Sequence, residues 1–261
     1  MRPPRALVRA VARAKPAVPE SAWPALLALR SLAGAGPVVG LPGWRRVLVL
    51  AAHPDDESVG AGGTLALLAD SGASVTAVFA TDGEATRGSK RASGATAALR
   101  RAEAAAACRV LGVADVRHLG LADGGLGASV DVLASAISAV SAELEPEAVM
   151  LPWWLDDHPD HQALSVALRA AEAPDSLEVW GYETWTPLPA NRIVDISAVL
   201  DRKRRALAAH ATAHLAFDVS ASVGLARWRS IYGLMGKGHA EAFLAAPVGG
   251  YLELMTRFAV Q

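Results

Sequence analysis

The sequence predicts an α/β fold: a Rossmann-like, mostly parallel sheet flanked by helices, with a metal site at the carboxyl ends of the strands. Three observations predict it. Short apolar runs alternate with longer segments of helical character. Hydrophobic residues make up 52% of the 261-residue chain, a composition suited to helices packed on a sheet. Motifs rich in histidine and aspartate follow two of the apolar runs.

The chain divides into an N-terminal extension, residues 1–42, which prolines interrupt, and an α/β domain with a C-terminal elaboration, residues 43–261. The first strand is expected at 46–51, RVLVLA, because a continuous apolar run is typical of a strand buried on both faces. Further strands are expected at 75–80, 116–119, 148–151, 177–182 and 193–196. Helices are expected at 63–69, 96–111, 130–143 and after Pro159.

Composition excludes several function classes. The net charge of −1 gives no electrostatic footprint for nucleic acid. The single cysteine, Cys108, can form neither an internal disulfide nor a cysteine-based metal site. Prolines and charges interrupt the early apolar runs, so neither a signal peptide nor an integral membrane segment is expected. We therefore expect a cytoplasmic protein that acts on a small molecule, and the sequence leaves a homo-oligomer open.

The first polar motif, AHPDDE, directly follows the first predicted strand. Adjacent Asp55 and Asp56 at the end of a buried strand would repel each other unless a cation or a proton compensated. Together with His53 they form a donor set suited to zinc. Asp55 and Asp56 could instead only cap the next helix, but that role needs one carboxylate and leaves His53 unexplained.

The second polar motif, HPDH at residues 158–161, follows the fourth predicted strand, and Pro159 suits the first turn of a helix. Taken separately, two histidines near a helix start often form only a polar loop. Both motifs lie at the same end of a parallel sheet, however, and together they supply three metal ligands and spare titratable groups. Three protein ligands with an open position are the pattern of a catalytic zinc.

With these two motifs the chain resembles the PIG-L (LmbE-like) family of zinc-dependent deacetylases, over residues 45 to about 210. The family includes deacetylases of glucosaminyl-phosphatidylinositol and of the mycothiol and bacillithiol precursors. The resemblance implies that His53, Asp56 and His161 bind one zinc ion per chain. It makes Asp55 the general base for the attacking water, and His158 the oxyanion stabiliser or acid.

The resemblance also implies that Asp160 hydrogen-bonds a histidine and sets its tautomer. Family segments that contact sugar hydroxyls match here at Arg87 and Asp123. The expected reaction is hydrolysis of an N-acyl amide, most simply N-acetyl, on an amino-sugar-containing small molecule.

Two alternatives stay open at the level of sequence. The same His-Asp-His set describes iron(II) oxygenases, so Fe²⁺ could replace zinc. Within the hydrolases, the substrate could carry a larger acyl group or a thiol conjugate.

Four further features have plainer interpretations. The glycines of residues 60–63 suggest close packing of a helix on the sheet, because they do not fit a phosphate-binding loop. The charged run 202–205 is expected on the exposed side of a helix. The pair His210 and His214 lacks a third metal ligand and suits a helix end. The pair 153–154, both tryptophan, suits either the core or a sugar-stacking wall.

Overall fold

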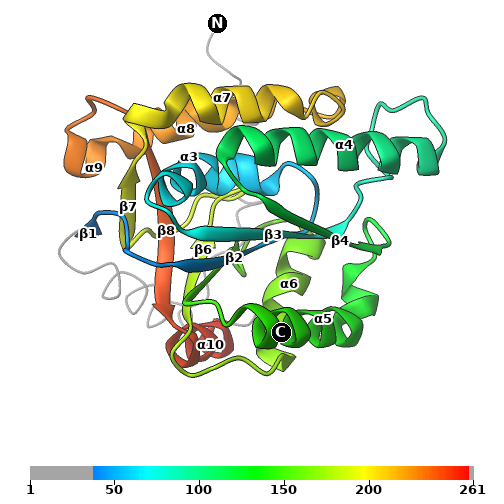
Figure 1. Cartoon of the computed structure of the whole chain (residues 1–261), viewed down its shortest axis with the longest axis horizontal. Coiled ribbons are helices and arrows are strands. Elements are labelled where there is room, and N and C mark those ends of the chain that lie inside the picture. The colour runs from blue at the N-terminus through cyan, green and yellow to red at the C-terminus, as the bar shows by residue number, and fades with distance from the viewer. Residues whose placement is uncertain (1–37, 259–261) are drawn as a thin grey trace, which may run out of the picture.

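The computed structural model describes residues 38–258, which form one eight-stranded sheet flanked by helices (Figure 1). The strands are β1 (Val38–Val39), β2 (Arg46–Ala51), β3 (Ser74–Thr81), β4 (Asp115–Leu121), β5 (Ala148–Pro152), β6 (Glu178–Tyr182), β7 (Arg192–Asp195) and β8 (Ala240–Pro247). The helices are α3 (Asp56–Asp70), α4 (Ser93–Leu111), α5 (Val130–Leu144), α6 (Pro159–Ala170), α7 (Leu200–Ala209), α8 (Ala221–Arg229), α9 (Ile231–Leu234) and α10 (Val248–Arg257). Short 3₁₀ turns are η2 (Leu126–Ser129), η3 (Ser197–Val199) and η4 (Ala213–Leu215).

The predicted mostly parallel sheet is confirmed. Its strand order is β1-β7-β8-β6-β5-β2-β3-β4, and β8 alone runs antiparallel to its neighbours β6 and β7. Every strand expected from the sequence is present, whereas β1 and β8 were not predicted. Helix α3 begins at Asp56, seven residues before the predicted start at 63, so the first polar motif lies partly inside the helix.

The order of the strands reverses at β2. From β2 the chain passes to β3 and β4 at one edge, and then returns to place β5 on the other side of β2. In open α/β sheets the crevice at such a reversal, beyond the carboxyl ends of the strands, is where ligands bind. The segments that follow β2 and β5 therefore share this crevice.

Helices cover both faces of the sheet. Helices α3, α4, α7 and α8 lie on one face, and α5, α6 and α10 lie on the other (Figure 1). The side chains of β2 alternate between these layers: Leu48 and Leu50 belong to the core under α5 and α6, and Val47 and Val49 to the core under α3 and α4. Burial on both faces explains the continuous apolar run.

The glycines of α3 allow it to approach the sheet closely, as predicted. A Cβ atom on Gly60 would lie 2.1 Å from the ring of Tyr182, and one on Gly63 would lie 2.6 Å from Ile196. The Tyr182 hydroxyl donates to the carbonyl of Leu50 at 2.8 Å, which fixes the ring against the helix.

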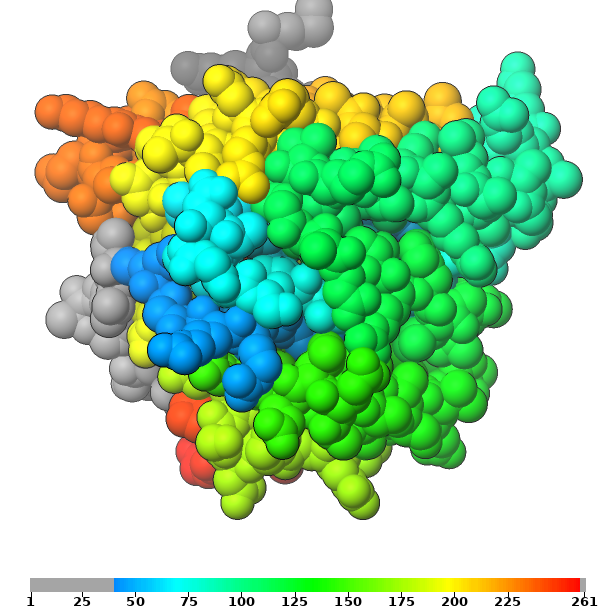
Figure 2. All heavy atoms as spheres, viewed as in Figure 1, coloured from blue at the N-terminus to red at the C-terminus, as the bar shows by residue number. Residues whose placement is uncertain are grey.

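The segment between β3 and α4, residues 82–92, projects from one end of the molecule (Figure 2). Residues 1–37 of the predicted extension lie outside the described residues. The following pair, Val38–Val39, aligns with β7 at the edge of the sheet.

One helical stretch among the described residues, Leu126–Leu144, is long and apolar enough to cross a membrane by length and composition. Five of its side chains, Leu126, Leu133, Ala134, Ile137 and Val140, pack into the core beneath the sheet. The absence of a membrane segment and the cytoplasmic location stay predictions.

Candidate active site

The two polar motifs meet in the crevice beside β2 and β5. Asp56 lies between two imidazoles: its Oδ1 is 3.2 Å from Nε2 of His161, and its Oδ2 is 3.7 Å from Nδ1 of His53. The backbone N–H of His53 also donates to Oδ2 at 2.9 Å. Burial alone would raise the pKa of Asp56, but the two histidines hold it well below its usual range. Asp56 is therefore a carboxylate that joins the two motifs.

His158 completes a group of three imidazoles. It is the N-cap residue of α6, and its Nδ1 accepts from the backbone N–H of Asp160 at 3.2 Å. Its ring centroid lies 4.7 Å from that of His53 and 4.8 Å from that of His161. Nitrogen atoms of all three rings lie within 4.8 Å of one another, a spacing at which they could hold a metal ion.

In two of these rings, the nitrogen that does not face Asp56, here called the outer nitrogen, contacts a buried carboxylate. Asp156 lies 2.9 Å from Nδ1 of His161, and Asp160 lies 3.2 Å from Nε2 of His53. The remaining nitrogen of His161, Nε2, is buried and lies 3.2 Å from Asp56 Oδ1, but not in hydrogen-bond geometry. A carboxylate on one nitrogen, with the second nitrogen directed at another potential ligand such as Asp56, is typical of a metal-binding histidine. The donor set therefore fits a divalent transition metal.

The carboxylates around the cluster raise the pKa of His53 and of His161. Burial would lower the pKa of His161, but Asp56 and Asp156 raise it to about 9. Burial would likewise lower the pKa of His53, and its neighbouring carboxylates, with Asp123 foremost, raise it well above the usual value. Metal binding would displace these protons, because a ligating imidazole must be neutral.

Asp55 pairs with a cation outside the cluster of histidines. Its φ of 146° is a strained backbone conformation for a non-glycine residue, of the kind found at functional sites. Its carboxylate lies 3.3 Å from the Arg100 guanidinium. Burial raises the pKa of Asp55 to about 6, against the opposing charge of Arg100. Asp55 is the N-cap residue of α3, yet its side chain makes no capping hydrogen bond, so helix capping does not explain it.

A buried hydrogen-bond network contacts the backbone of Asp55. Glu57 Oε2 accepts the backbone N–H of Asp55 at 3.1 Å, and Glu57 Oε1 lies 2.9 Å from Nε2 of His210. His210 is buried at the end of α7; burial would lower its pKa, and Glu57 raises it. His214 is half-exposed and forms no metal group with His210 among the described residues.

The two predicted substrate residues line the same cavity but differ in setting. Arg87 is exposed on the projecting segment 82–92. Asp123 lies 3.1 Å from Nε2 of His53 and accepts the backbone N–H of Ala85 at 2.9 Å. Asp123 therefore links the predicted substrate loops to a metal-cluster histidine.

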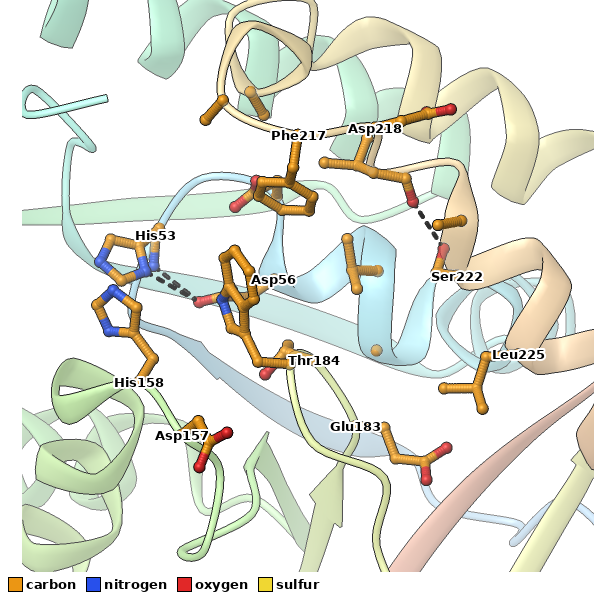
Figure 3. A pocket seen from close by; sticks show the side chains of 18 of the residues that line it. His53, Asp56, Asp157, His158, Glu183, Thr184, Phe217, Asp218, Ser222 and Leu225 are labelled. Carbon is orange, nitrogen blue, oxygen red and sulfur yellow. Dashed lines mark hydrogen bonds and ion pairs between the residues drawn. The ribbon is translucent and has the colours of Figure 1, made fainter. Parts of the chain in front are cut away.

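The cavity has a volume of about 630 Å³, within the range of sites for small molecules. His53, Asp56 and His158 lie along one side of it, and Leu225 lies on the opposite side (Figure 3). Trp153 and Trp154 do not line it; both are buried in the core with Tyr251, so the core interpretation of this pair is correct.

Comparison with known proteins identifies the family. Residues 48–172 match the PIG-L family, described as GlcNAc-PI de-N-acetylase. A probable N-acetyl-α-D-glucosaminyl L-malate deacetylase of Bacillus cereus is 33% identical over 181 residues, 64% of this chain and 82% of the relative. The chain belongs to the PIG-L family. It is accordingly an enzyme of the deacetylase type, an amidohydrolase, which favours hydrolysis over the oxygenase alternative.

One further relative agrees with this PIG-L assignment, and one solved structure shares the fold. The diacetylchitobiose deacetylase of Thermococcus kodakarensis is 34% identical over 188 residues, 64% of this chain and 69% of the relative. The N,N′-diacetylchitobiose deacetylase of Pyrococcus horikoshii, crystallised with an inhibitor, superposes with a TM-score of 0.65 over 91% of this chain and 96% of that chain. At 24% identity this second likeness shows the fold alone.

Some residues of the site were not predicted from the sequence, and others lie beyond the range that matches the PIG-L family. Asp156 and Arg100 lie within the matched range 48–172, but neither was predicted to be a site residue. Asp156 is adjacent to the HPDH motif and could have been found as a third carboxylate at that strand end. Arg100 lies in the middle of a helix, and no local pattern marks it. His210 and the cavity wall formed by residues 213–229 lie beyond the match.

Proposed function

We propose that this PIG-L enzyme is a zinc-dependent deacetylase that hydrolyses an N-acetyl amide on an amino-sugar-containing small molecule. The observation that carries the proposal is Asp56 between His53 and His161, two imidazoles whose outer nitrogens contact buried carboxylates. The named activities of the relatives, all deacetylations of N-acetylated sugars, support the substrate class.

In this proposal His53, Asp56 and His161 hold one zinc ion. When bound, zinc supplies a Lewis acid and lowers the pKa of water toward about 7, which makes a nucleophile available at neutral pH. The three protein ligands leave a coordination position open, as in catalytic zinc sites. Fe²⁺ in place of zinc is compatible with the same donors.

Asp55 acts as the general base. It lines the cavity, and a pKa of about 6 leaves it deprotonated at neutral pH while it remains basic enough to take a proton. It accepts the proton of the attacking water and passes it to the amide nitrogen as the C–N bond breaks. The products are a carboxylic acid, which keeps the second proton of the water, and a free amine; the acid then ionises by giving that proton to the amine or to solvent, and Asp55 returns to its starting state.

His158 stabilises the oxyanion as a neutral donor in this proposal. Because its Nδ1 accepts from the backbone N–H of Asp160, a neutral ring carries its proton on Nε2. Burial and the nearby His53 and His161 lower the pKa of His158, which favours the neutral ring over the protonated one. A preorganised N–H donor of this kind typically contributes about 10²–10³ in kcat.

The test combines metal analysis with acetate release from N-acetylglucosamine conjugates. We expect about one zinc ion per chain and release of acetate. Asp55→Ala should keep the metal and lose most turnover, whereas His161→Ala should lose the metal. Failure to bind zinc, or near-normal turnover of Asp55→Ala, would refute the assignment; zinc binding without acetate release would refute the N-acetyl substrate.

A further inference from the structure

The cavity continues well past the metal cluster into an arm that the proposed reaction does not use. We call it the distal arm and define it by its lining residues beyond the reacting centre: Val59, Ala213, Ala216, Phe217, Val219, Ala221, Leu225, Ala226, Ala240 and Ala242. Helix α8 turns one face towards it through Ser222, Leu225 and Arg229. Figure 3 shows Ser222 and Leu225 on the side of the cavity away from His53 and His158.

The charged groups along the distal arm are already paired with each other. Lys203 Nζ donates to Glu241 at 2.6 Å and to the carbonyl of Val59 at 2.8 Å. Glu241 also accepts the backbone N–H of Gly63 and of Thr64. Both charged side chains are buried, and each charge is compensated by the other, so neither is available to pair with a ligand.

A second ion pair, between Arg229 and Glu183, is likewise complete without a ligand. Arg229 Nε donates to Glu183 Oε2 at 3.1 Å, and the guanidinium also donates to the carbonyl of Leu188. The uncharged polar groups are committed too: the Ser222 hydroxyl donates to the carbonyl of Val219, and the Thr184 hydroxyl donates to Asp156. Hydroxyl groups of a second sugar would therefore find few partners in this arm.

Two aromatic side chains that line the cavity pack against each other and are partly exposed. Trp185 and Phe217 have ring centroids 4.7 Å apart and remain 54% and 37% exposed. Exposed apolar side chains that rim a cavity indicate a site for an apolar ligand. Asp218 also lines the cavity, but its side chain is 72% exposed, and its carboxylate accepts from the Ser220 hydroxyl and lies 3.4 Å from Nδ1 of His214.

We propose that the distal arm binds a linear aliphatic chain carried by the substrate. This inference rests on the proposed function, because it describes what is attached to the amide that the metal site cleaves. An aliphatic chain needs no hydrogen-bond partners, and it gains by leaving water for the alanine, valine and leucine walls. The chain is either the N-acyl group itself or an alkyl group on the anomeric oxygen of the sugar.

The experiment measures binding to the zinc-loaded enzyme by calorimetry in two series. The first series contains alkyl glucosaminides from methyl to octyl, which are amines and cannot turn over. The second contains N-acylglucosamines from acetyl to octanoyl, bound to the Asp55→Asn variant to stop hydrolysis. In at least one of the two series, the affinity of the ligand for the enzyme should rise about threefold to fourfold for each added methylene until the chain fills the arm.

Variants of α8 test whether the chain lies where the structure places it. Leu225→Gln should cut the octyl-to-methyl affinity ratio at least tenfold, and Ser222→Phe, which narrows the arm without adding a polar group, should do the same. Arg227→Gln is the matched control, because Arg227 is exposed on the same helix and does not line the cavity. It should leave the ratio unchanged.

The outcomes separate this inference from the proposed function. A rise confined to the glucosaminides assigns the arm to the aglycone and leaves the N-acetyl substrate in place. A rise confined to the N-acyl series assigns it to the acyl group and replaces acetyl by a longer acyl group in the proposed function. Affinity that does not change with chain length in either series overturns the aliphatic site, even if acetate is released. Chain-length dependence without any amide hydrolysis supports the aliphatic site and refutes the proposed function alone.

Discussion

Asp156 gives the sharpest test of how the metal ligands are held. Its Oδ1 lies 2.9 Å from Nδ1 of His161, and its Oδ2 accepts from the Thr184 hydroxyl and from the backbone N–H groups of Trp185 and Thr186, at 2.8, 2.9 and 3.1 Å. In Asp156→Asn the side chain keeps its size, but one acceptor oxygen becomes an NH₂ donor. Whichever way the amide turns, this donor faces another donor in a site with no solvent exposure.

Two effects follow, and their sizes can be estimated. If the amide NH₂ faces Nδ1 of His161, the ring must change tautomer and present N–H towards the metal position. Loss of a carboxylate partner of this kind typically weakens metal binding about 10- to 100-fold. If the NH₂ instead faces the backbone of Trp185 and Thr186, unsatisfied buried donors cost about 1–3 kcal/mol of the free energy of unfolding.

The assay is competition for zinc against a chromophoric chelator, with thermal unfolding of the metal-free protein measured in parallel. Asp157→Asn is the matched control, because Asp157 is the exposed neighbouring carboxylate in the same loop. It should change neither quantity appreciably. A folded Asp156→Asn protein with the zinc affinity and stability of the unmodified chain would show that Asp156 does not orient His161.

Three further predictions concern other parts of the structure. Arg100→Gln should move the acidic limb of the kcat/KM–pH profile to higher pH, because Arg100 holds the pKa of Asp55 down to about 6 and the base is active only when deprotonated; an unmoved limb contradicts this. Gly60→Ala should lower the free energy of unfolding by about 1–3 kcal/mol, because its Cβ would lie 2.1 Å from Tyr182, whereas the control Gly94→Ala, with open space around it, should lose none; denaturant titration compares them. Lys203→Met should destabilise the fold by about 3–5 kcal/mol by leaving Glu241 buried without its cation, and a urea midpoint like that of the unmodified protein would refute this.

The fold could be predicted where local patterns determine it. The run RVLVLA is buried on both faces and is a central parallel strand, as its continuous apolar character predicts. Strand β8, with the sequence AEAFLAAP, was not predicted, because its antiparallel insertion between β6 and β7 depends on partners distant in sequence. The expected exposure of 202–205 was wrong for Lys203, which is 1% exposed, because its pairing with Glu241 also lies outside any local window.

The same distinction applies to the active site. The two motifs each follow a strand, so their meeting could be predicted from the strand pattern and the rule for parallel sheets. Asp123 and Arg87 were found only through the resemblance to PIG-L proteins. Arg100 reaches Asp55 from a helix that begins after the projecting segment 82–92, a contact that only the packed structure reveals.

Glu57 connects the backbone of the first polar motif to the segment that forms the wall of the distal arm. It accepts the backbone N–H of Asp55 through one oxygen and contacts Nε2 of His210 through the other. His210 ends α7, and the wall residues from Ala213 onward follow it directly. A single buried carboxylate thus connects the strained backbone of the proposed base to the start of the segment that surrounds the substrate. We therefore expect that displacing this wall disturbs the position of Asp55 as well as the shape of the arm.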